Sequence, residues 1–322
     1  MHAVFLDYKT VDANDLDLGS IKELLPEMVV HPFSNEVEVL ERIEDAEVAI
    51  ANKVVFDAEV FARASKLKLI CVTATGTNNI DLEAATRSGV VVCNIRDYCT
   101  DSVVQHVLLS ILTLMHSFKD YSDSIESGDW QDGKSFSLLQ HPIAELSGKS
   151  IGILGYGVLG QGVARAAATI GLNVLICESF AKEKKPDEDL ERISFEAFLT
   201  ESDIISLHCP LTHNTEGLFD DNAFKKMKSS AILINTARGG LIDDHALIKA
   251  IEDKVIAVAA IDVLNQEPPD SSHPLIQKQY SNLIITPHIA WAAQEARQRA
   301  LDRIAENIEA FQNNRPINVV ID

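Results

Sequence analysis

The chain has 322 residues, which at roughly 150 residues per domain predicts about two domains and excludes a small disulfide-stapled scaffold. Hydrophobic residues make up 46% and charged residues 24%, the balance of an ordinary globular protein. Lys and Arg number 28 against 48 Asp and Glu, so the formal net charge is −20. This charge argues against nucleic acid or an anionic membrane surface as the main partner, and it leaves room for a small anion in a locally positive cleft.

The cysteines and the N-terminal residues indicate in which cellular compartment the protein is expected. The number of cysteines is odd, no C-x-x-C pair occurs, and we expect neither a disulfide framework nor a metal site. The first twelve residues are interrupted by Asp7 and show no secretory signal. The longest apolar run, Val255 to Ile261, is far short of the ~18 residues of a membrane helix. We therefore expect a cytoplasmic protein that does not bind membranes. The cysteines are Cys71, Cys93, Cys99, Cys177 and Cys209.

The first hundred residues alternate short β-rich apolar runs with helical segments, which indicates a parallel sheet covered by helices. Helices are predicted at Asp57 to Ser65 and Asp81 to Gly89, each with an acidic residue near its start. The predicted strands are Ala3 to Leu6, Val48 to Ala51, Leu69 to Thr73 and Val90 to Cys93.

From Asp101 to about Ile125, apolar residues recur near the 3.6-residue period and predict one long helix. The following segment, Ser127 to Pro142, is polar and turn-rich and carries Trp130, so it is predicted as a loop or an arm. Because a monomer gains little from an ordered loop of this kind, we expect it to contact another subunit.

A second alternating series begins at Lys149 and predicts a doubly wound nucleotide-binding domain with six strands. Its predicted strands are Ile151 to Leu154, Val174 to Cys177, Ile204 to Leu207, Ile232 to Ile234, Ile256 to Ile261 and Leu283 to Ile285. A helix from Ala292 to Asn313 follows, and residues 317–321 are predicted as a last strand that returns to the first domain. The expected division is thus residues 1–100 and 290–322 for one discontinuous domain and 101–289 for the other.

Glycines after the first strand of this series indicate a dinucleotide site. Gly155, Gly157 and Gly160 form a G-x-G-x-x-G pattern between a predicted strand and a helix that continues to about Ile170. The first allows a tight turn, the second lets amides approach a pyrophosphate, and the third lets the helix pack on the strand. The alternative is a strand–turn–helix with incidental glycines.

Glu178 ends the next strand, eighteen residues after Gly160, where a carboxylate can accept hydrogen bonds from ribose hydroxyls. It favours NAD over NADP because a carboxylate repels a 2′-phosphate. Lys182, Lys184 and Lys185 follow closely, and we interpret them as solvated surface charges.

Polar residues follow the later strands, and in a parallel sheet these positions share one edge. A guanidinium can hold a substrate carboxylate, an imidazole can supply a proton, and a carboxylate can fix that imidazole's tautomer. Each of these residue types also has an ordinary interpretation when it is considered alone. Arg238 could form a surface ion pair, Glu267 could be a loop carboxylate, and His288 could be a structural residue. Together, the three indicate a site for hydride transfer to a carbonyl. The residues are Thr236, Ala237 and Arg238 after one strand, Asp262 and Glu267 after the next, and His288 after the last. His106 and His208 are interpreted as structural or cofactor-adjacent.

Six segments together resemble the D-isomer-specific 2-hydroxyacid dehydrogenase family and span most of the chain. They are Thr73 to Ala85, Leu154 to Gln161, His208 to Phe219, Ile234 to Asp243, Ala260 to Pro269 and Pro287 to Trp291. The resemblance implies that Arg238, Glu267 and His288 are catalytic. It also implies a dinucleotide site lined by Thr75, Val158, Leu159, Glu178, Cys209, Pro210, Thr215, Thr236 and Asp262.

The same resemblance suggests where the substrate binds. It implies that the loop Ala74 to Thr77, in which Gly76 allows close approach, offers amides to the substrate carboxylate, and that Asn52 and Lys53 face the same cleft. Trp291 directly follows the P-H-I-A run and is similar to its counterpart in glycerate dehydrogenases, also called hydroxypyruvate reductases. Many members of the family carry Asp at position 178 and Glu at position 105, where this chain has Glu178 and Gln105.

The expectation is an α/β protein with a Rossmann doubly wound domain and a discontinuous flavodoxin-like substrate domain. Its expected activity is NAD-dependent reduction of a 2-keto acid, with hydroxypyruvate or glyoxylate leading, to the D-2-hydroxy acid by a homodimer. Two alternatives remain: a formate- or phosphite-type dehydrogenase of the same fold, and a NAD-sensing corepressor-like binding protein.

Overall fold

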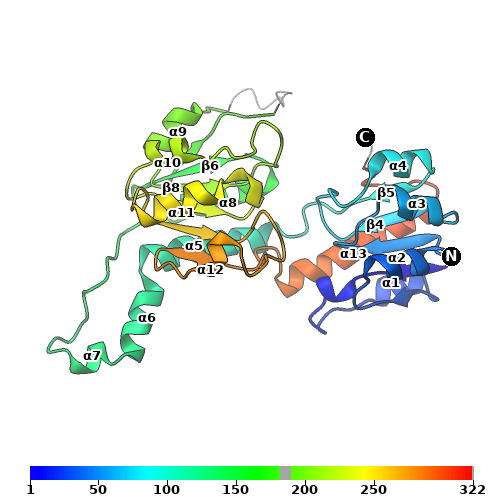
Figure 1. The fold of residues 1–322 in the computed structure, drawn as a ribbon, viewed down its shortest axis with the longest axis horizontal. Helices are drawn as coiled ribbons and strands as arrows, with labels where there is room; N and C mark the ends of the chain where they lie inside the picture. Colours follow the sequence, from blue (N-terminus) through cyan, green and yellow to red (C-terminus); the bar gives the residue numbers. More distant parts are fainter. Residues whose placement is uncertain (182–189, 321–322) are drawn as a thin grey trace. The chain divides into compact units, whose positions relative to one another are not determined.

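The computed structural model describes residues 1–181 and 190–320 (Figure 1). The chain divides into two compact units. Unit 1 comprises Met1–Cys99 together with Trp291–Asp322, and unit 2 comprises Thr100–Ala290. Each is built on a parallel sheet, which confirms the predicted α/β class.

Unit 1 contains a five-stranded parallel sheet in the order β2-β1-β3-β4-β5. The strands are β1 (Ala3–Phe5), β2 (Val29–Val30), β3 (Val48–Ala51), β4 (Leu69–Val72) and β5 (Val91–Cys93). All except β2 were predicted, and β2 has only two residues, too few to show a pattern. The helices are η1 (Tyr8–Thr10), α1 (Gly19–Leu24), α2 (Glu36–Ile43), α3 (Ala58–Arg63), α4 (Leu82–Arg87) and α13 (Gln294–Gln312).

Alternate residues of the unit 1 strands enter two different cores, because successive side chains of a strand point to opposite faces. Val48 and Ile50 of β3 join a core that includes Leu301 and Ile304 of α13. The intervening β3 residues, represented by Ala49, join the core on the other face, with residues of α2, α3 and α4. The C-terminal helix thus covers one face of the N-terminal sheet, which explains why this domain is discontinuous.

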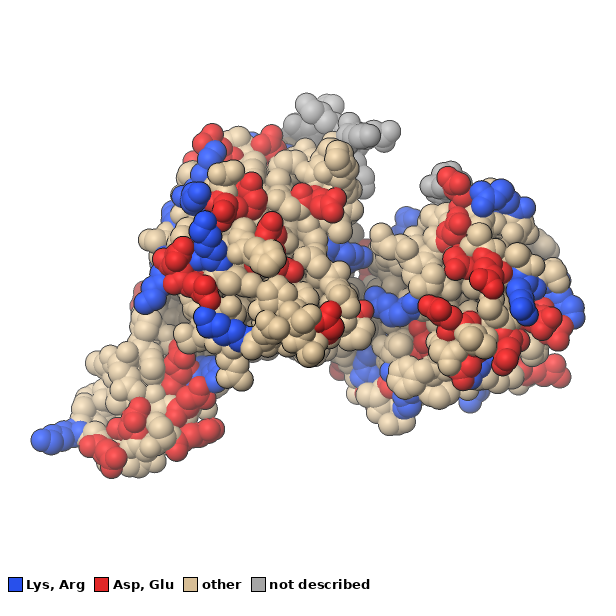
Figure 2. Space-filling view, in the orientation of Figure 1, with Lys and Arg blue, Asp and Glu red and all other residues tan. Residues whose placement is uncertain are grey.

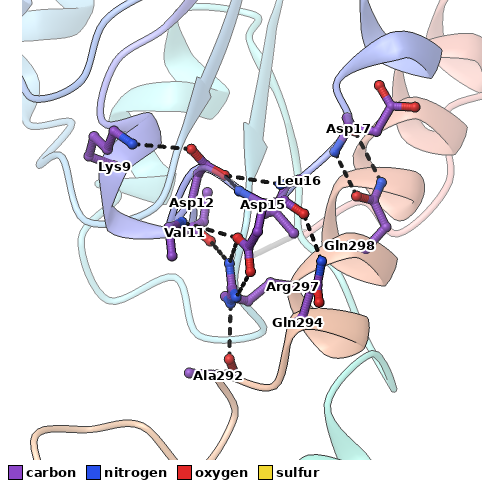
Figure 3. Close-up of polar contacts among 11 residues, drawn as sticks. Lys9, Val11, Asp12, Asp15, Leu16, Asp17, Ala292, Gln294, Arg297 and Gln298 are labelled. Carbon is purple, nitrogen blue, oxygen red and sulfur yellow. Dashed lines mark hydrogen bonds and ion pairs between the residues drawn. The ribbon is translucent and has the colours of Figure 1, made fainter.

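Polar contacts also fix α13 to the N-terminal part of unit 1 (Figure 3). The Arg297 guanidinium donates to both carboxylate oxygens of Asp15, at 2.8 and 2.7 Å, and its Nε donates to the carbonyl of Ala292. Gln298 accepts from the Asp17 amide at 2.9 Å and donates to the Asp17 carbonyl at 3.1 Å. Such two-point pairs define geometry as well as adding energy.

The predicted final strand is shorter in the structure. Val319 forms a single antiparallel bridge with Cys93, and the amide of Val320 donates to the carbonyl of Val92 at 2.8 Å. The C-terminal segment therefore returns to β5 of unit 1, as predicted, through one bridge rather than a strand of several residues.

Unit 2 contains a six-stranded parallel sheet in the order β11-β10-β9-β8-β6-β7. The chain enters at β6 inside the sheet and builds outward in both directions, which confirms the doubly wound prediction. The strands are β6 (Ser150–Leu154), β7 (Asn173–Ile176), β8 (Ile204–Leu207), β9 (Ile232–Asn235), β10 (Val258–Ile261) and β11 (Leu283–Ile285).

Helices pack on both sides of this sheet. A Cβ added at Gly162 of α8 would lie 3.0 Å from side chains of Thr100 and Val104 of α5, so these two helices pack closely. Phe198, Phe219 and Phe224 fill the core on the opposite side. The helices are α5 (Thr100–Met115), α6 (Phe118–Glu126), α7 (Asp129–Asp132), α8 (Val158–Thr169), α9 (Phe195–Glu201), α10 (Asp221–Lys226), η2 (Gly239–Leu241), α11 (Asp244–Glu252) and α12 (Pro274–Gln277).

The single long helix predicted from Asp101 to Ile125 is wrong, because the chain breaks between α5 and α6. Ser117 adopts a left-handed conformation with φ 46°, and its hydroxyl donates to the carbonyl of Pro142 at 2.7 Å. The Tyr121 ring of α6 packs edge-on against the His141 ring, with 5.0 Å between the ring centroids. These contacts hold the returning segment of chain against α6. We call residues 117–143 the arm; Figure 1 shows its helices α6 and α7 extending away from the unit 2 sheet.

Acidic and basic side chains are interspersed over the face shown in Figure 2. Within residues 1–181 and 190–320, no helix is both long and apolar enough to cross a bilayer. The same described residues contain no group of three or more His, Cys, Asp or Glu side chains arranged to hold a metal ion.

Candidate active site

The turn between β6 and α8 requires two of its glycines. Gly155 has a φ of 93°, and a Cβ there would lie 2.4 Å from the amide nitrogen of Cys209. A Cβ on Gly160 would lie 2.0 Å from the carbonyl oxygen of Gly155. No side chain fits at either position, so these glycines bring β6, α8 and the loop after β8 into contact.

Gly157 has a different role. A Cβ at Gly157 would meet no atom of the described chain within 4 Å, so the space beside this backbone is open. Gly157 is also the N-cap of α8, and being a glycine it offers no side chain to cap the helix. The first amides of α8, which begins with Val158 and Leu159, therefore remain available to an anion. These features fit the pyrophosphate of a dinucleotide.

Glu178 follows β7, as predicted, and its Oε1 accepts from the amide of Phe195 at 2.7 Å. One carboxylate oxygen therefore holds the start of α9, a contact that sequence reasoning missed. Lys182, Lys184 and Lys185, interpreted above as surface charges, lie outside the described residues.

The loop after β8 begins with His208, Cys209 and Pro210 and is fixed by Thr215. The Thr215 side chain is buried; its hydroxyl donates to the Pro210 carbonyl and accepts from the Thr212 amide, both at 2.8 Å. This hydroxyl shapes the loop. That Thr215 also lines the dinucleotide, as expected, stays a prediction.

His208 is a neutral ring at the base of this loop. Its Nε2 lies 2.8 Å from the Ser206 hydroxyl, while the buried Nδ1 has no hydrogen-bond partner among the described residues. Burial lowers the pKa of His208 to about 4, because a charged imidazolium loses its hydration there.

At the end of β9, a buried asparagine organises the turn that carries Arg238. Asn235 Oδ1 accepts from the Ala237 amide at 3.0 Å, and Nδ2 donates to the Arg238 carbonyl at 2.8 Å. Sequence reasoning missed Asn235, although a polar residue ending an apolar strand is a usable signal. The Thr236 hydroxyl between them is buried and finds no hydrogen-bond partner in the described part of the chain, so a bound ligand can satisfy it.

The Arg238 side chain is exposed, and its Nη1 donates to the carbonyl of the preceding residue at 2.7 Å. It forms no ion pair with any residue that the structure describes, so the alternative of a surface ion pair finds no partner there. A Cβ on Gly239 would lie 2.1 Å from the carbonyl carbon of Leu264. The turn bearing Arg238 thus packs directly on the loop that leads to Glu267.

Asp262, at the end of β10, fixes the loop after β11. Its side chain is almost completely buried, and its backbone carbonyl accepts from the His288 amide at 2.8 Å. The carboxylate accepts from the Thr286 hydroxyl at 2.5 Å, the Ile289 amide at 2.9 Å and the Ala290 amide at 2.8 Å. Asp262 was expected to contact the dinucleotide; these bonds give it a second role, holding the His288 loop.

His106 on α5 reaches the same network, with its Nε2 3.3 Å from the Thr286 hydroxyl oxygen. Of the two roles expected for His106, structural or cofactor-adjacent, this contact supports the structural one.

Glu267 and His288 meet directly. His288 Nδ1 lies 2.6 Å from Glu267 Oε2, and the other oxygen of Glu267 accepts from the Leu264 amide at 2.8 Å. His288 has a φ of 55°, the left-handed region that is uncommon for a residue with a side chain. The carboxylate fixes the tautomer with hydrogen on Nδ1 and leaves Nε2 for a substrate.

Apart from Arg238, the residues expected to bind substrate are in unit 1, and four of them lie on loops after its strands. Asn52 and Lys53 follow β3, while Thr75 and Gly76 follow β4. The Thr75 hydroxyl donates to the Ile95 carbonyl at 2.9 Å. Trp291 precedes α13, and its ring packs edge-on against Tyr98 with 6.3 Å between centroids.

Comparison with known proteins gives consistent matches over the whole chain. Residues 108–290 match the NAD binding domain of the D-isomer specific 2-hydroxyacid dehydrogenases. The chain is 42% identical over 317 residues to a glycerate dehydrogenase of Methylorubrum extorquens, covering 98% of each chain. It is 34% identical to a hydroxypyruvate reductase of Blautia hydrogenotrophica, covering 99% of each. A solved structure of a Thermus thermophilus protein superposes with a TM-score of 0.86 at 31% identity, over 100% of both chains.

Proposed function

Because this chain belongs to the D-isomer specific 2-hydroxyacid dehydrogenase family, we propose that it reduces a small 2-keto acid to the D-2-hydroxy acid. Hydroxypyruvate, giving D-glycerate, is the leading substrate, and glyoxylate is the next. The names of two similar proteins, a glycerate dehydrogenase and a hydroxypyruvate reductase, support hydroxypyruvate as the substrate, and so does the aromatic Trp291 close in sequence to His288. The observation that carries the proposal is the hydrogen bond of 2.6 Å between His288 Nδ1 and Glu267 Oε2.

NAD is the cofactor of this domain family, and the residues present fit it. The open space at Gly157, the uncapped start of α8 and the Glu178 carboxylate would hold its pyrophosphate and ribose. When bound in its reduced form, it supplies the hydride. The negative charge of Glu178 supports NAD over NADP, because a 2′-phosphate would be repelled.

Arg238 is proposed to hold the substrate. Its guanidinium can donate two parallel hydrogen bonds to a carboxylate and can polarise the neighbouring carbonyl oxygen. Asn235 and Gly239 fix the turn from which Arg238 projects. The exposed guanidinium donates to one backbone carbonyl and, since it carries five N–H groups, has donors to spare for an anionic substrate.

His288 is proposed as the acid that donates a proton from Nε2 to the oxygen on C2 as that carbon is reduced. Glu267 stabilises the charged ring and keeps its orientation through Nδ1. In the reverse direction the same nitrogen accepts the proton from the hydroxy acid. Asp262 keeps His288 in place by holding the loop on both sides of it.

We further propose that the protein is a cytoplasmic homodimer. Apolar side chains on the arm are exposed in the single chain, a pattern that favours burial against a second copy. They are Phe118, Ile125, Trp130, Phe136, Leu139 and Ile143. All five cysteines are free thiols, which supports a reducing compartment.

A coupled assay of NADH oxidation with a panel of acids tests the proposed activity. We expect turnover with hydroxypyruvate or glyoxylate, a product of D configuration from hydroxypyruvate, and no NAD reduction with formate or phosphite. Oxidation of formate or phosphite without reduction of 2-keto acids would favour a different dehydrogenase of the same fold. NADH binding with no turnover of any acid would favour a NAD-sensing binding protein.

A further inference from the structure

A buried carboxylate in unit 1 organises the loop that carries Asn52 and Lys53. Asp7 lies just after β1, and its side chain accepts from three consecutive backbone amides of the loop after β3. The distances are 2.8 Å from Oδ1 to the Asn52 nitrogen, and 2.6 and 3.2 Å from Oδ2 to the Lys53 and Val54 nitrogens. Both oxygens are therefore used to hold one short stretch of backbone.

Other side chains bind the backbone carbonyls of the same loop. Asn79, in the loop after β4, donates from Nδ2 to the Val54 carbonyl at 2.7 Å and lies 3.4 Å from the Asn52 carbonyl. The Asn52 side chain donates to the Thr10 hydroxyl at 3.0 Å. Amides and carbonyls of the loop are thus fixed by side chains from outside it, and between buried Asn52 and Val54 only Lys53 is exposed.

Burial of the Asp7 carboxyl opposes its negative charge. Burial raises the pKa of the Asp7 carboxyl above its usual range, although three backbone amides and the charge of Lys53 act to lower it. The ionised carboxylate is therefore favoured less in the folded protein than in the unfolded chain, so this group contributes less to stability at neutral pH than at acidic pH. The carboxylate nevertheless accepts hydrogen bonds from three amides of one turn.

We propose that Asp7 is a positioning residue for the substrate: it sets the conformation of the loop Asn52–Val54 in which Lys53 is presented to the carboxylate of the 2-keto acid. This inference rests on the proposed function. Asp7 touches neither substrate nor cofactor, and it acts through the backbone of the loop. Since the dinucleotide motif belongs to unit 2, a loosened loop in unit 1 should weaken substrate binding and leave NADH binding unchanged.

The test compares Asp7→Asn, Asn79→Ala and a matched control. Asp7→Asn replaces one acceptor oxygen by an NH2 group that faces the amide donors, and Asn79→Ala frees the carbonyl side of the same loop. Asp12→Asn is the control, because Asp12 is also a buried unit 1 carboxylate that accepts backbone amides, those of Asp15 and Leu16. These amides lie in the loop shown in Figure 3, away in sequence from the substrate loop.

We expect the KM for hydroxypyruvate to rise about tenfold in Asp7→Asn, the effect of one lost hydrogen bond, with a kcat within about threefold of wild type. Asn79→Ala should shift KM in the same direction. The Kd for NADH, measured by fluorescence titration, should be unchanged in both variants, and Asp12→Asn should keep the wild-type KM.

A wild-type KM in both loop variants would overturn the inference, and so would an equal rise in the control. If Asp7→Asn does not fold, the KM of Asn79→Ala decides the question alone. Failure of the wild-type protein to reduce any 2-keto acid would refute the proposed function, and this inference with it. Turnover by the wild type with unaltered KM in the variants refutes only the role of Asp7.

Discussion

The His208 ring gives the protein a defined response to acid. Burial lowers its folded-state pKa to about 4, from an ordinary value of 6.5. Between these values the unfolded chain binds a proton that the folded chain does not, so stability falls as the pH is lowered through this window. The full shift corresponds to a loss of about 3 kcal/mol in the free energy of unfolding.

We therefore expect His208→Gln, which lacks a titrating ring, to lose less stability than the wild type between neutral pH and about pH 4. Urea denaturation at several pH values measures the difference. Other groups titrate in the same range in both proteins, so the difference between them isolates His208. Identical pH dependence in the two proteins would contradict the account.

Prediction from sequence worked best for the positions of the three residues proposed to be catalytic. Arg238, Glu267 and His288 each follow a strand of one parallel sheet, and the common edge of such a sheet is known before its structure is. The position of Asn235 at the end of a strand is visible in the sequence, but its role, like that of Asp7, is not. Both act through hydrogen bonds to the backbone of a loop, and which amides a side chain reaches depends on loop conformation, which residue pattern does not specify.

The turn between β6 and α8 contains one glycine beside open space, Gly157, and one packed against backbone, Gly160. Gly157→Ala adds a methyl group where no described atom lies within 4 Å, at a φ of −81° that alanine adopts readily. We expect its stability to change by less than about 0.5 kcal/mol, while its NADH affinity falls about tenfold because the methyl enters the space proposed for the pyrophosphate.

Gly160→Ala is the matched variant, since its Cβ would lie 2.0 Å from a backbone oxygen. It should be destabilised by about 1–3 kcal/mol as α8 is pushed from β6. Thermal denaturation and NADH fluorescence titration of the two variants check this contrast. A strongly destabilised Gly157→Ala, or one that binds NADH as well as wild type, would contradict the assignment.

Regular elements were predicted well because buried parallel strands and amphipathic helices leave strong periodic patterns. The errors occurred where one residue changes the path of the chain. Ser117 breaks the predicted long helix through a left-handed conformation and a hydrogen bond to Pro142, 25 positions away in sequence. Neither feature alters the apolar pattern, which runs on through the break.

The proposed homodimer depends on the arm, whose exposed apolar side chains would form the interface. Phe136 is 93% exposed and Leu139 84% exposed in the single chain. If the arm binds a second copy, charges at these positions should prevent it. We expect Phe136→Asp combined with Leu139→Asp to be monomeric, and the wild type to be dimeric, by light scattering.

Phe33→Asp serves as the control, because Phe33 is an exposed aromatic residue of unit 1, 61% accessible, outside the arm. It should remain dimeric. A monomeric wild type, or a double variant that still forms dimers, would show that the arm does not form the interface.

In the proposed reaction, His288, held by Glu267, supplies the proton. The measurement is kcat for hydroxypyruvate reduction by His288→Gln, with the NADH Kd measured on the same sample and His245→Gln, an exposed histidine of α11, as the control. We predict that kcat falls about 10²- to 10⁴-fold in His288→Gln while NADH binding and the control are unchanged. A kcat within a few-fold of wild type would contradict it.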